Sequence, residues 1–190
     1  VLPIDIKLAD QLDEQTLARL DAQLELINPI LAGRHRPNYR VWAWPLILPS
    51  LQAQLKDTSK EVLDYNLATR ASAAGKPIGS LEDPITQLDG MKKLTLEEQI
   101  LFLKDTLDSM EEADKEGADT EAELTELYLK GDIEALQELI ESDSEEGLPK
   151  EVSEKIMDAM FYTRNAKMAD TILRALKKHP DKSHFFAAGS

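Results

Sequence analysis

Hydrophobic residues recur at helical spacing along most of the chain. Residues 17–27 carry the first such pattern, which ends at Pro29. Residues 42–55 carry a second one, rich in tryptophan and leucine, and it predicts a buried helix interrupted by proline. A third helix is predicted over residues 59–74, where Gly75 closes it.

Helix-start signals divide the second half of the chain into further helices. A threonine followed three residues later by glutamate forms a capping box, and aspartate and proline also favour first turns. Such signals stand at Thr95 with Glu98, Thr120 with Glu123, Asp132 and Pro149. The last predicted helix continues toward Lys178.

Two short apolar segments, residues 78–81 and 185–188, are predicted as strands. If they run parallel in one sheet, their carboxyl ends lie at one edge, where α/β folds form ligand crevices. Neighbouring strands are about 4.8 Å apart, so Glu82 and Gly189 are expected within roughly 10–15 Å of each other. The predicted fold class is therefore α/β (α+β), mostly helical with a small parallel sheet remnant.

The net charge of −14 is concentrated in an acidic helical segment, residues 97–154, which holds 21 Asp/Glu against 4 Lys/Arg. Such a block repels phosphate backbones, so no nucleic acid is expected as a partner. Two interpretations of the segment stay open, solvated helix faces or a surface for cations or a basic partner. No window approaches the roughly 20 apolar residues of a membrane-spanning helix, so no transmembrane segment is expected.

Complete catalytic motifs are absent from the sequence. The three histidines, His35, His179 and His184, share no helical face and no metal-ligand spacing. There is no His-Glu-x-x-His, no phosphate-binding glycine loop, no dinucleotide fingerprint and no serine in a nucleophile elbow. The lack of cysteine excludes disulfides and thiolate metal sites.

Arg164 is predicted at the centre of an apolar helix face. A buried guanidinium is costly unless it is paired, so a carboxylate or a bound anion should meet it. Two roles stay open, a structural salt bridge or an arginine that holds a catalytic carboxylate or a reacting oxygen. The other residues of this face are Met157, Met160, Phe161, Met168 and Ile172.

Three stretches resemble the Tiki/TraB/GumN family. Residues 164–168 are similar to the family's Arg-Asn-x-x-Met helix, and residues 180–189 to the strand that leads into a Gly-x-x-His motif. Residues 76–82, followed by Gln87, resemble its Gly-x-Leu-Glu-x-x-x-x-Gln segment. Weaker similarity elsewhere extends the resemblance over nearly the whole chain.

The resemblance implies a metal-dependent hydrolase, with proteolysis as the activity suggested within the family, acting on a peptide or a small amide or ester. It also implies a divalent metal (Mn, Co or Zn) held by two Gly-x-x-His motifs and glutamates, which would activate a bound water. Glu82 is then the candidate metal ligand or general base. Arg164 would orient a carboxylate or stabilise an oxyanion. Asn165, Gln87 and Gly189 are candidates for binding the substrate or supporting the catalytic residues.

The resemblance further implies that residues 1–190 form a single TraB/GumN-like domain, with an EreA/ChaN-like core truncated at both ends. Both motif histidines are expected outside the chain, before Val1 and after Ser190. These 190 residues alone are therefore expected to be inactive and to bind no metal tightly. Some relatives carry export signals, which implies an extracytoplasmic location, periplasmic or membrane-anchored.

Two alternatives to the hydrolase remain open. The chain could be a helical protein-interaction module, in which the acidic helices and the Trp42/Trp44 segment bind a partner. It could also be a degenerate family member that retains the fold without the chemistry. Exposure of Trp42 and Trp44 would favour the module, whereas burial, which we expect, would assign both to the core.

Overall fold

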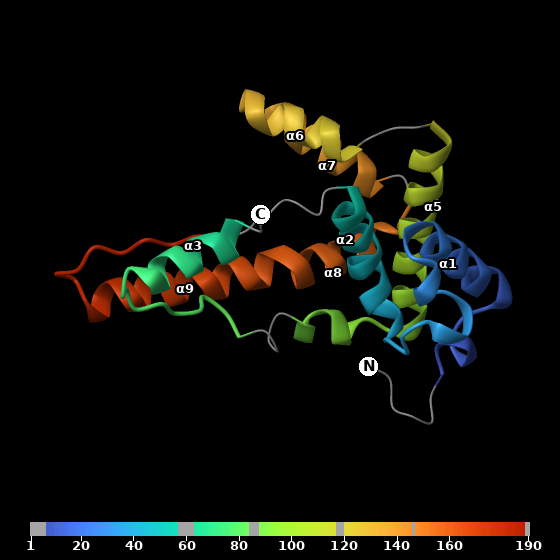
Figure 1. Cartoon of the computed structure of the whole chain (residues 1–190), viewed down its shortest axis with the longest axis horizontal. Coiled ribbons are helices and arrows are strands. Elements are labelled where there is room, and N and C mark those ends of the chain that lie inside the picture. The colour runs from blue at the N-terminus through green and yellow to red at the C-terminus, as the bar shows by residue number, and fades with distance from the viewer. Residues whose placement is uncertain (1–6, 57–62, 84–87, 117–119, 146, 189–190) are drawn as a thin grey trace. The chain divides into compact units, whose positions relative to one another are not determined.

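A computed structural model describes residues 7–56, 63–83, 88–116, 120–145 and 147–188. The regular elements of these residues are helical (Figure 1). In order they are η1 (Leu8–Asp10), α1 (Glu14–Ile27), η2 (Pro29–Leu31), η3 (Gly33–His35), η4 (Val41–Ala43), α2 (Trp44–Lys56), α3 (Leu63–Ala73), η5 (Met91–Lys93), α5 (Leu96–Glu116), α6 (Thr120–Lys130), α7 (Ile133–Glu145), α8 (Lys150–Met157), η6 (Asp158–Tyr162) and α9 (Thr163–Lys178). The η elements are 3₁₀ turns except η6, which is π-helical.

The chain divides into two compact units. Unit 1 consists of Val1–Lys56 and Leu94–Glu154, and unit 2 consists of Asp57–Lys93 and Lys155–Ser190. The helices α1, α2 and α5 pack together in unit 1. None of the helices in the described part of the chain is both long and apolar enough to cross a membrane.

The core of unit 1 forms where the apolar faces of its helices meet. The predicted helix over residues 17–27 is confirmed as α1, which Asp13 caps by accepting a hydrogen bond from the Thr16 amide. The proline-interrupted helix is confirmed as α2, with Pro49 inside it. The fully buried core side chains include Leu20, Leu24, Trp44, Leu48, Leu103 and Leu107.

Both tryptophans are buried, as expected. Trp42 is 8% exposed and Trp44 is 1% exposed, and the Trp44 ring packs against Tyr39 at a centroid distance of 5.6 Å. The predicted burial of Leu46–Leu51 holds in full for Leu48 and in part for Leu46, Ile47 and Leu51, while Pro49 and Ser50 are exposed. The interaction-module alternative therefore loses the exposed aromatic patch that would have favoured it.

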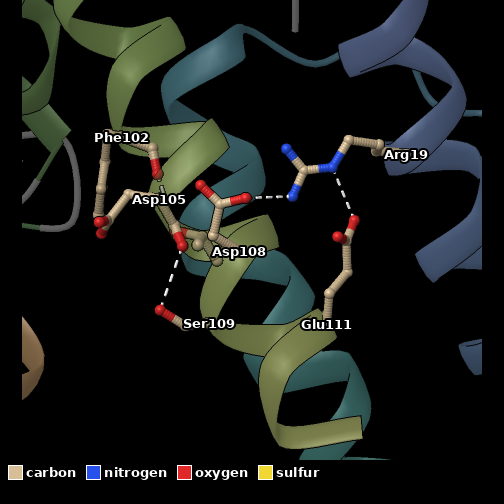
Figure 2. A network of polar contacts seen from close by, with 7 residues as sticks. Arg19, Phe102, Asp105, Asp108, Ser109 and Glu111 are labelled. Carbon is tan, nitrogen blue, oxygen red and sulfur yellow. Dashed lines mark hydrogen bonds and ion pairs between the residues drawn. The ribbon is translucent and has the colours of Figure 1, made fainter. Parts of the chain in front are cut away.

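Polar contacts hold α1 against α5 at the edge of this core (Figure 2). Arg19 of α1 donates from Nε to Glu111 Oε1 at 2.7 Å and from Nη2 to Asp108 Oδ1 at 2.6 Å. Lys104 of α5 donates to Asp13 Oδ2 at 3.0 Å. Because Asp108 and Glu111 lie three residues apart, they share one face of α5 and can meet one guanidinium.

Three of the predicted helix ends, at Thr95, Gly75 and Asp132, are confirmed. The Thr95 amide donates to the Glu98 carboxylate at 2.9 Å, and the Glu98 amide donates to Thr95 Oγ1 at 3.2 Å, which is the predicted capping box. Asp132 caps α7 by accepting from the Ala135 amide at 3.1 Å. Gly75 closes α3 with φ of 65°, a conformation that side-chain-bearing residues rarely adopt.

The predicted α/β fold class with a parallel sheet remnant is wrong. No strand occurs in the ranges that the structure describes, and residues 78–81 and 185–188 are irregular chain. A strand requires backbone hydrogen bonds to a neighbouring segment, and neither segment forms a ladder with another described one. Both are also solvent-facing, with Ile78 56% and Phe185 78% exposed. The architecture of the described residues is predominantly helical.

Unit 2 is built around α9 and the π-helical turn η6 that precedes it. A Cβ added to Gly90 would lie 2.8 Å from the Ala159 Cβ and 2.9 Å from its Cα, so the loop before η5 approaches η6 to contact distance. The predicted helix over residues 59–74 is confirmed as α3 from Leu63 onward, and its first residues lie outside the described ones. No residue of α3 or α9 is fully buried.

Candidate functional site

The irregular segment after α3 brings Glu82 to α9 within unit 2. The Lys76 amide donates to the Ala71 carbonyl at 3.0 Å and the Gly75 amide to the Ser72 carbonyl at 2.9 Å, which ends α3 in a Schellman motif. The chain then continues without regular structure, and the Ser80 hydroxyl donates to the Glu82 carbonyl. The Glu82 side chain is 18% exposed.

Arg164 meets Glu82 with both arms of its guanidinium. Nη2 donates to Oε1 at 2.5 Å and Nε donates to Oε2 at 3.1 Å. The third guanidinium nitrogen, Nη1, donates to the Met160 carbonyl in η6 at 2.8 Å. The Arg164 side chain is 22% exposed. The expectation that a carboxylate would meet this arginine therefore agrees with the structure.

The π-helical turn supplies one of these acceptors. In η6 the Thr163 amide bonds to the Asp158 carbonyl five residues earlier, so the turn is one residue wider than an α-helical turn. The Met160 carbonyl lies in this turn and accepts from Arg164. Single π turns are frequent at functional sites. The guanidinium is therefore held from two sides, by a carboxylate and by a main-chain carbonyl.

The pairing keeps Glu82 ionised. Hydrogen bonds from Arg164 lower the pKa of the Glu82 carboxyl, against the opposing effect of burial, and the charge of Lys167 lowers it further. Glu82 in turn raises the pKa of Arg164. Each carboxylate oxygen has two lone pairs, and Arg164 occupies one on each. Glu82 therefore retains capacity to accept a further hydrogen bond or to coordinate a cation.

Glu82 lies in the wall of an open hollow of about 970 Å³ in unit 2. The segment after α3 supplies one wall and α9 the other. The lining residues are Ser80, Leu81, Glu82, Asp83, Lys167, Asp170, Thr171, Leu173, Arg174 and Lys177. Ligand sites commonly have volumes of about 300–1,000 Å³, so the hollow is large enough for a small ligand.

The structure brings together some of the predicted site residues and not others. Glu82 and Arg164 are in direct contact, and Asn165 is an exposed neighbour of Arg164 on α9. Gln87 and Gly189 lie outside the described residues, so the predicted proximity of Glu82 and Gly189 stays a prediction. His184 Nε2 lies 2.9 Å from the His179 carbonyl, after the end of α9.

The sequence interpretation missed the basic residues of the hollow. Lys167, Arg174 and Lys177 line it together with Thr171, to which Arg174 Nη2 donates at 3.0 Å. The available signal was the composition of residues 164–178, where five Lys/Arg stand against one Asp in a strongly acidic chain. That contrast indicates a surface of opposite charge to the rest of the protein.

Comparison with known protein families gives a match over the whole chain. A family model described as "TraB/PrgY/gumN family" matches residues 1–190. The chain belongs to the TraB/PrgY/gumN family. No solved structure matches it.

Relatives of this TraB/PrgY/gumN chain are named metalloproteases. The chain is 25% identical over 177 residues to Metalloprotease TIKI2 of Xenopus tropicalis, covering 84% of this chain and 34% of that protein. It is 24% identical over 177 residues to human Metalloprotease TIKI1, covering 84% and 35%. The Metalloprotease TIKI homolog of Nematostella vectensis is 24% identical over 165 residues, covering 79% and 35%. The chain thus spans about a third of the length of these relatives.

Proposed function

We propose that this chain contributes to a hydrolase of the metalloprotease type, in which Glu82 faces a peptide bound in the hollow of unit 2. The observation that carries the proposal is the two-armed contact between Arg164 and Glu82 at the wall of that hollow. It joins the two residues that the family resemblance singled out for catalysis. Membership of the TraB/PrgY/gumN family supports the reaction class.

The electrostatics favour one of the two roles considered for Glu82. A general base works best when its pKa lies near the working pH, whereas Arg164 lowers the pKa of Glu82. A carboxylate that stays ionised is better suited to binding a cation or to orienting a water molecule by accepting its hydrogen bond. We therefore assign Glu82 the role of a fixed anionic acceptor and Arg164 the role of positioning it.

The pairing of Arg164 with Glu82 could also be a structural salt bridge without a catalytic role. Its third contact, to the Met160 carbonyl, would fit that role equally well, because it adds rigidity without touching the hollow. The distinction lies in what happens when the bridge is weakened but the charge is kept. If Arg164 positions Glu82, such a substitution lowers kcat. If Arg164 is only structural, the substitution lowers the free energy of unfolding and leaves kcat unchanged.

A divalent metal enters the proposal through the names of the relatives. Among the described residues there is no group of three or more His, Cys, Asp or Glu side chains that could hold a metal ion. A hydrolytic metal site needs about three protein ligands and an open position, so these residues do not by themselves fit one. The roles assigned above are therefore those of the chain's own side chains, and none of them is routed through a metal.

The test is the Glu82→Gln substitution in the intact protein, assayed with a library of internally quenched peptides. Glutamine keeps the size of the side chain and removes the charge, so we expect kcat to fall by about a hundredfold or more. The melting temperature should change little. Glu138→Gln, which removes a charge from the exposed face of α7, is the matched control and should leave kcat unchanged.

A second substitution separates positioning from mere stability. Arg164→Lys keeps the charge but cannot form the two parallel hydrogen bonds. We expect it to lower kcat with little change in KM. Full activity of Glu82→Gln, or an intact protein that cleaves no peptide of the library, would refute the proposal.

A further inference from the structure

Helix α9 is basic, whereas the acidic excess of the chain lies in residues 97–154. Its sixteen residues, Thr163–Lys178, include five Lys/Arg and one Asp, whereas the whole chain carries a net charge of −14. Arg164 is neutralised by Glu82. The other cations of the helix are Lys167, Arg174, Lys177 and Lys178, and the first three of these line the hollow.

The basic residues of the hollow form no ion pair with a carboxylate of the described residues, although Glu82, Asp83 and Asp170 also line the hollow and the charge of Lys167 lowers the pKa of Glu82. With the residues that the structure describes, Lys167, Arg174 and Lys177 form no ion pair, whereas Arg19, Arg36, Lys92, Lys104, Lys130 and Arg164 each do. Arg174 contacts the Thr171 hydroxyl, a neutral acceptor, at 3.0 Å. Five donors on a planar guanidinium leave most of its hydrogen-bonding capacity free for an anion.

We propose that Arg174, supported by Lys167 and Lys177, binds a carboxylate group of the peptide that occupies the hollow. The proposal deepens the proposed function, on which it rests for the identity of the occupant as a peptide. The carboxylate can come from an acidic side chain or from the free carboxyl terminus of the peptide. Arg174 is then a specificity-determining residue remote from Glu82.

The distance between Arg164 and Arg174 along α9 predicts how many peptide residues separate the group beside Glu82 from the carboxylate at Arg174. Arg174 follows Arg164 by ten residues, which is about 15 Å along a helix axis. An extended peptide advances about 3.3 Å per residue, so the distance corresponds to about four or five residues. A peptide group beside Glu82 would therefore place an acidic residue, or a terminal carboxylate, about four or five positions away at Arg174.

A rival explanation is that these cations serve the helix itself. Basic side chains in the last turn of a helix interact favourably with its dipole. Lys177 and Lys178 both lie in that last turn, and they differ in that Lys177 lines the hollow. The pair therefore provides a matched comparison, in which the same change of charge is made one residue apart.

The test is direct binding of labelled peptides to the intact protein, measured by fluorescence anisotropy at 0.15 M salt. Four decapeptides of matched length are used: one with two glutamates and an amidated end, one neutral with a free carboxyl terminus, one neutral and amidated, and one with two lysines and an amidated end. Unspecific attraction to the acidic segment, residues 97–154, would favour the lysine peptide. We expect the glutamate peptide or the free-terminus peptide to bind best, and the better of the two identifies the source of the carboxylate.

Charge reversal then locates the site. Arg174→Glu and Lys177→Glu should each weaken binding of the preferred peptide by about tenfold or more, whereas Lys178→Glu should weaken it less than about twofold. Equal effects at Lys177 and Lys178, or no preference for either carboxylate-bearing peptide, would overturn the proposal. Circular dichroism of each variant confirms that α9 is retained.

This measurement does not depend on hydrolysis, so the two proposals fail separately. Carboxylate-selective binding by a protein that cleaves no peptide would support the binding site and refute the proposed function. Cleavage that depends on Glu82, without any preference for carboxylate-bearing peptides, would support the function and refute the role of Arg174.

Discussion

Arg164 holds Glu82, a residue 82 positions earlier in the chain, through two parallel hydrogen bonds of 2.5 and 3.1 Å. The contact ties α9 to the irregular segment that follows α3, and both side chains are mostly shielded from solvent. Such a fork-to-carboxylate contact depends on the planar shape of the guanidinium as well as on its charge.

Replacement of this arginine should therefore cost stability. We expect Arg164→Met to lower the free energy of unfolding by about 2 kcal/mol, because Glu82 is left partly buried without its partner. Urea unfolding followed by circular dichroism measures the change. In the double variant with Glu82→Gln the loss should be smaller than the sum of the two single losses. Additive losses would show that the two side chains do not stabilise each other.

Close packing at Gly90 gives a second prediction. Gly90→Ala places a Cβ 2.8 Å from the Ala159 Cβ and 3.0 Å from its carbonyl oxygen, so backbone has to shift. We expect a loss of about 1–3 kcal/mol in the free energy of unfolding. Gly79→Ala is the matched control, because a Cβ there meets nothing within 4 Å and should be neutral or slightly stabilising.

A compensating change checks the cause of that loss. Ala159→Gly removes the Cβ that Gly90→Ala would meet, so the double variant should recover part of the stability. No recovery, with Gly79→Ala also destabilising, would show that the loss comes from the alanine substitution itself and not from the contact.

Truncation of the core of unit 1 should be the most damaging change of all. Trp44 is 1% exposed among the leucines of α1, α2 and α5, so Trp44→Ala is expected to lower the free energy of unfolding by about 3–5 kcal/mol. Leu129→Ala on α6 is the control, since Leu129 is 78% exposed and its removal should cost less than about 0.5 kcal/mol. Chemical denaturation of both variants measures the two losses in the free energy of unfolding. A loss for Trp44→Ala no larger than that for Leu129→Ala would contradict the prediction.

The cap of α1 should make stability depend on pH in the acid range. A hydrogen bond from the Thr16 amide, with a further one from Lys104, lowers the pKa of Asp13 from 3.8 to about 2. A carboxyl whose pKa is lowered by folding stabilises the fold at pH values above 3.8, and this contribution disappears as the pH falls toward 2.

The Asp13→Asn substitution keeps a side chain that can cap the helix but removes the titrating carboxyl group. The free energy of unfolding of Asp13→Asn should therefore fall less steeply between about pH 4 and pH 2 than that of the unchanged protein. Urea unfolding at a series of pH values measures both slopes. Parallel curves for the two proteins would show that Asp13 contributes nothing to the acid sensitivity.

Local signals in the sequence predicted most of the helices. The capping box at Thr95 and Glu98 is formed as its spacing predicts, and Asp132 and Gly75 mark helix ends as expected. These features depend on residues within one or two turns of each other, so they can be inferred without the rest of the fold. The burial of Trp42 and Trp44 followed from the same kind of apolar pattern.

The two predicted strands were wrong because a strand is defined by its neighbours. Residues 78–81 and 185–188 have suitable side chains, but the described structure provides neither of them with a hydrogen-bonded partner. The choice between a strand and an irregular segment is thus made by tertiary structure. Periodicity alone does not distinguish the two for segments this short.

The sequence by itself determined that Arg164 needs a partner, because a guanidinium among methionines of a helix face is unfavourable alone. Only the tertiary structure decided that this partner is Glu82, and that Lys167, Arg174 and Lys177 share a hollow with it. The reason is physical. Helical spacing relates residues along one element, whereas pairing across 82 residues depends on how the chain between them folds.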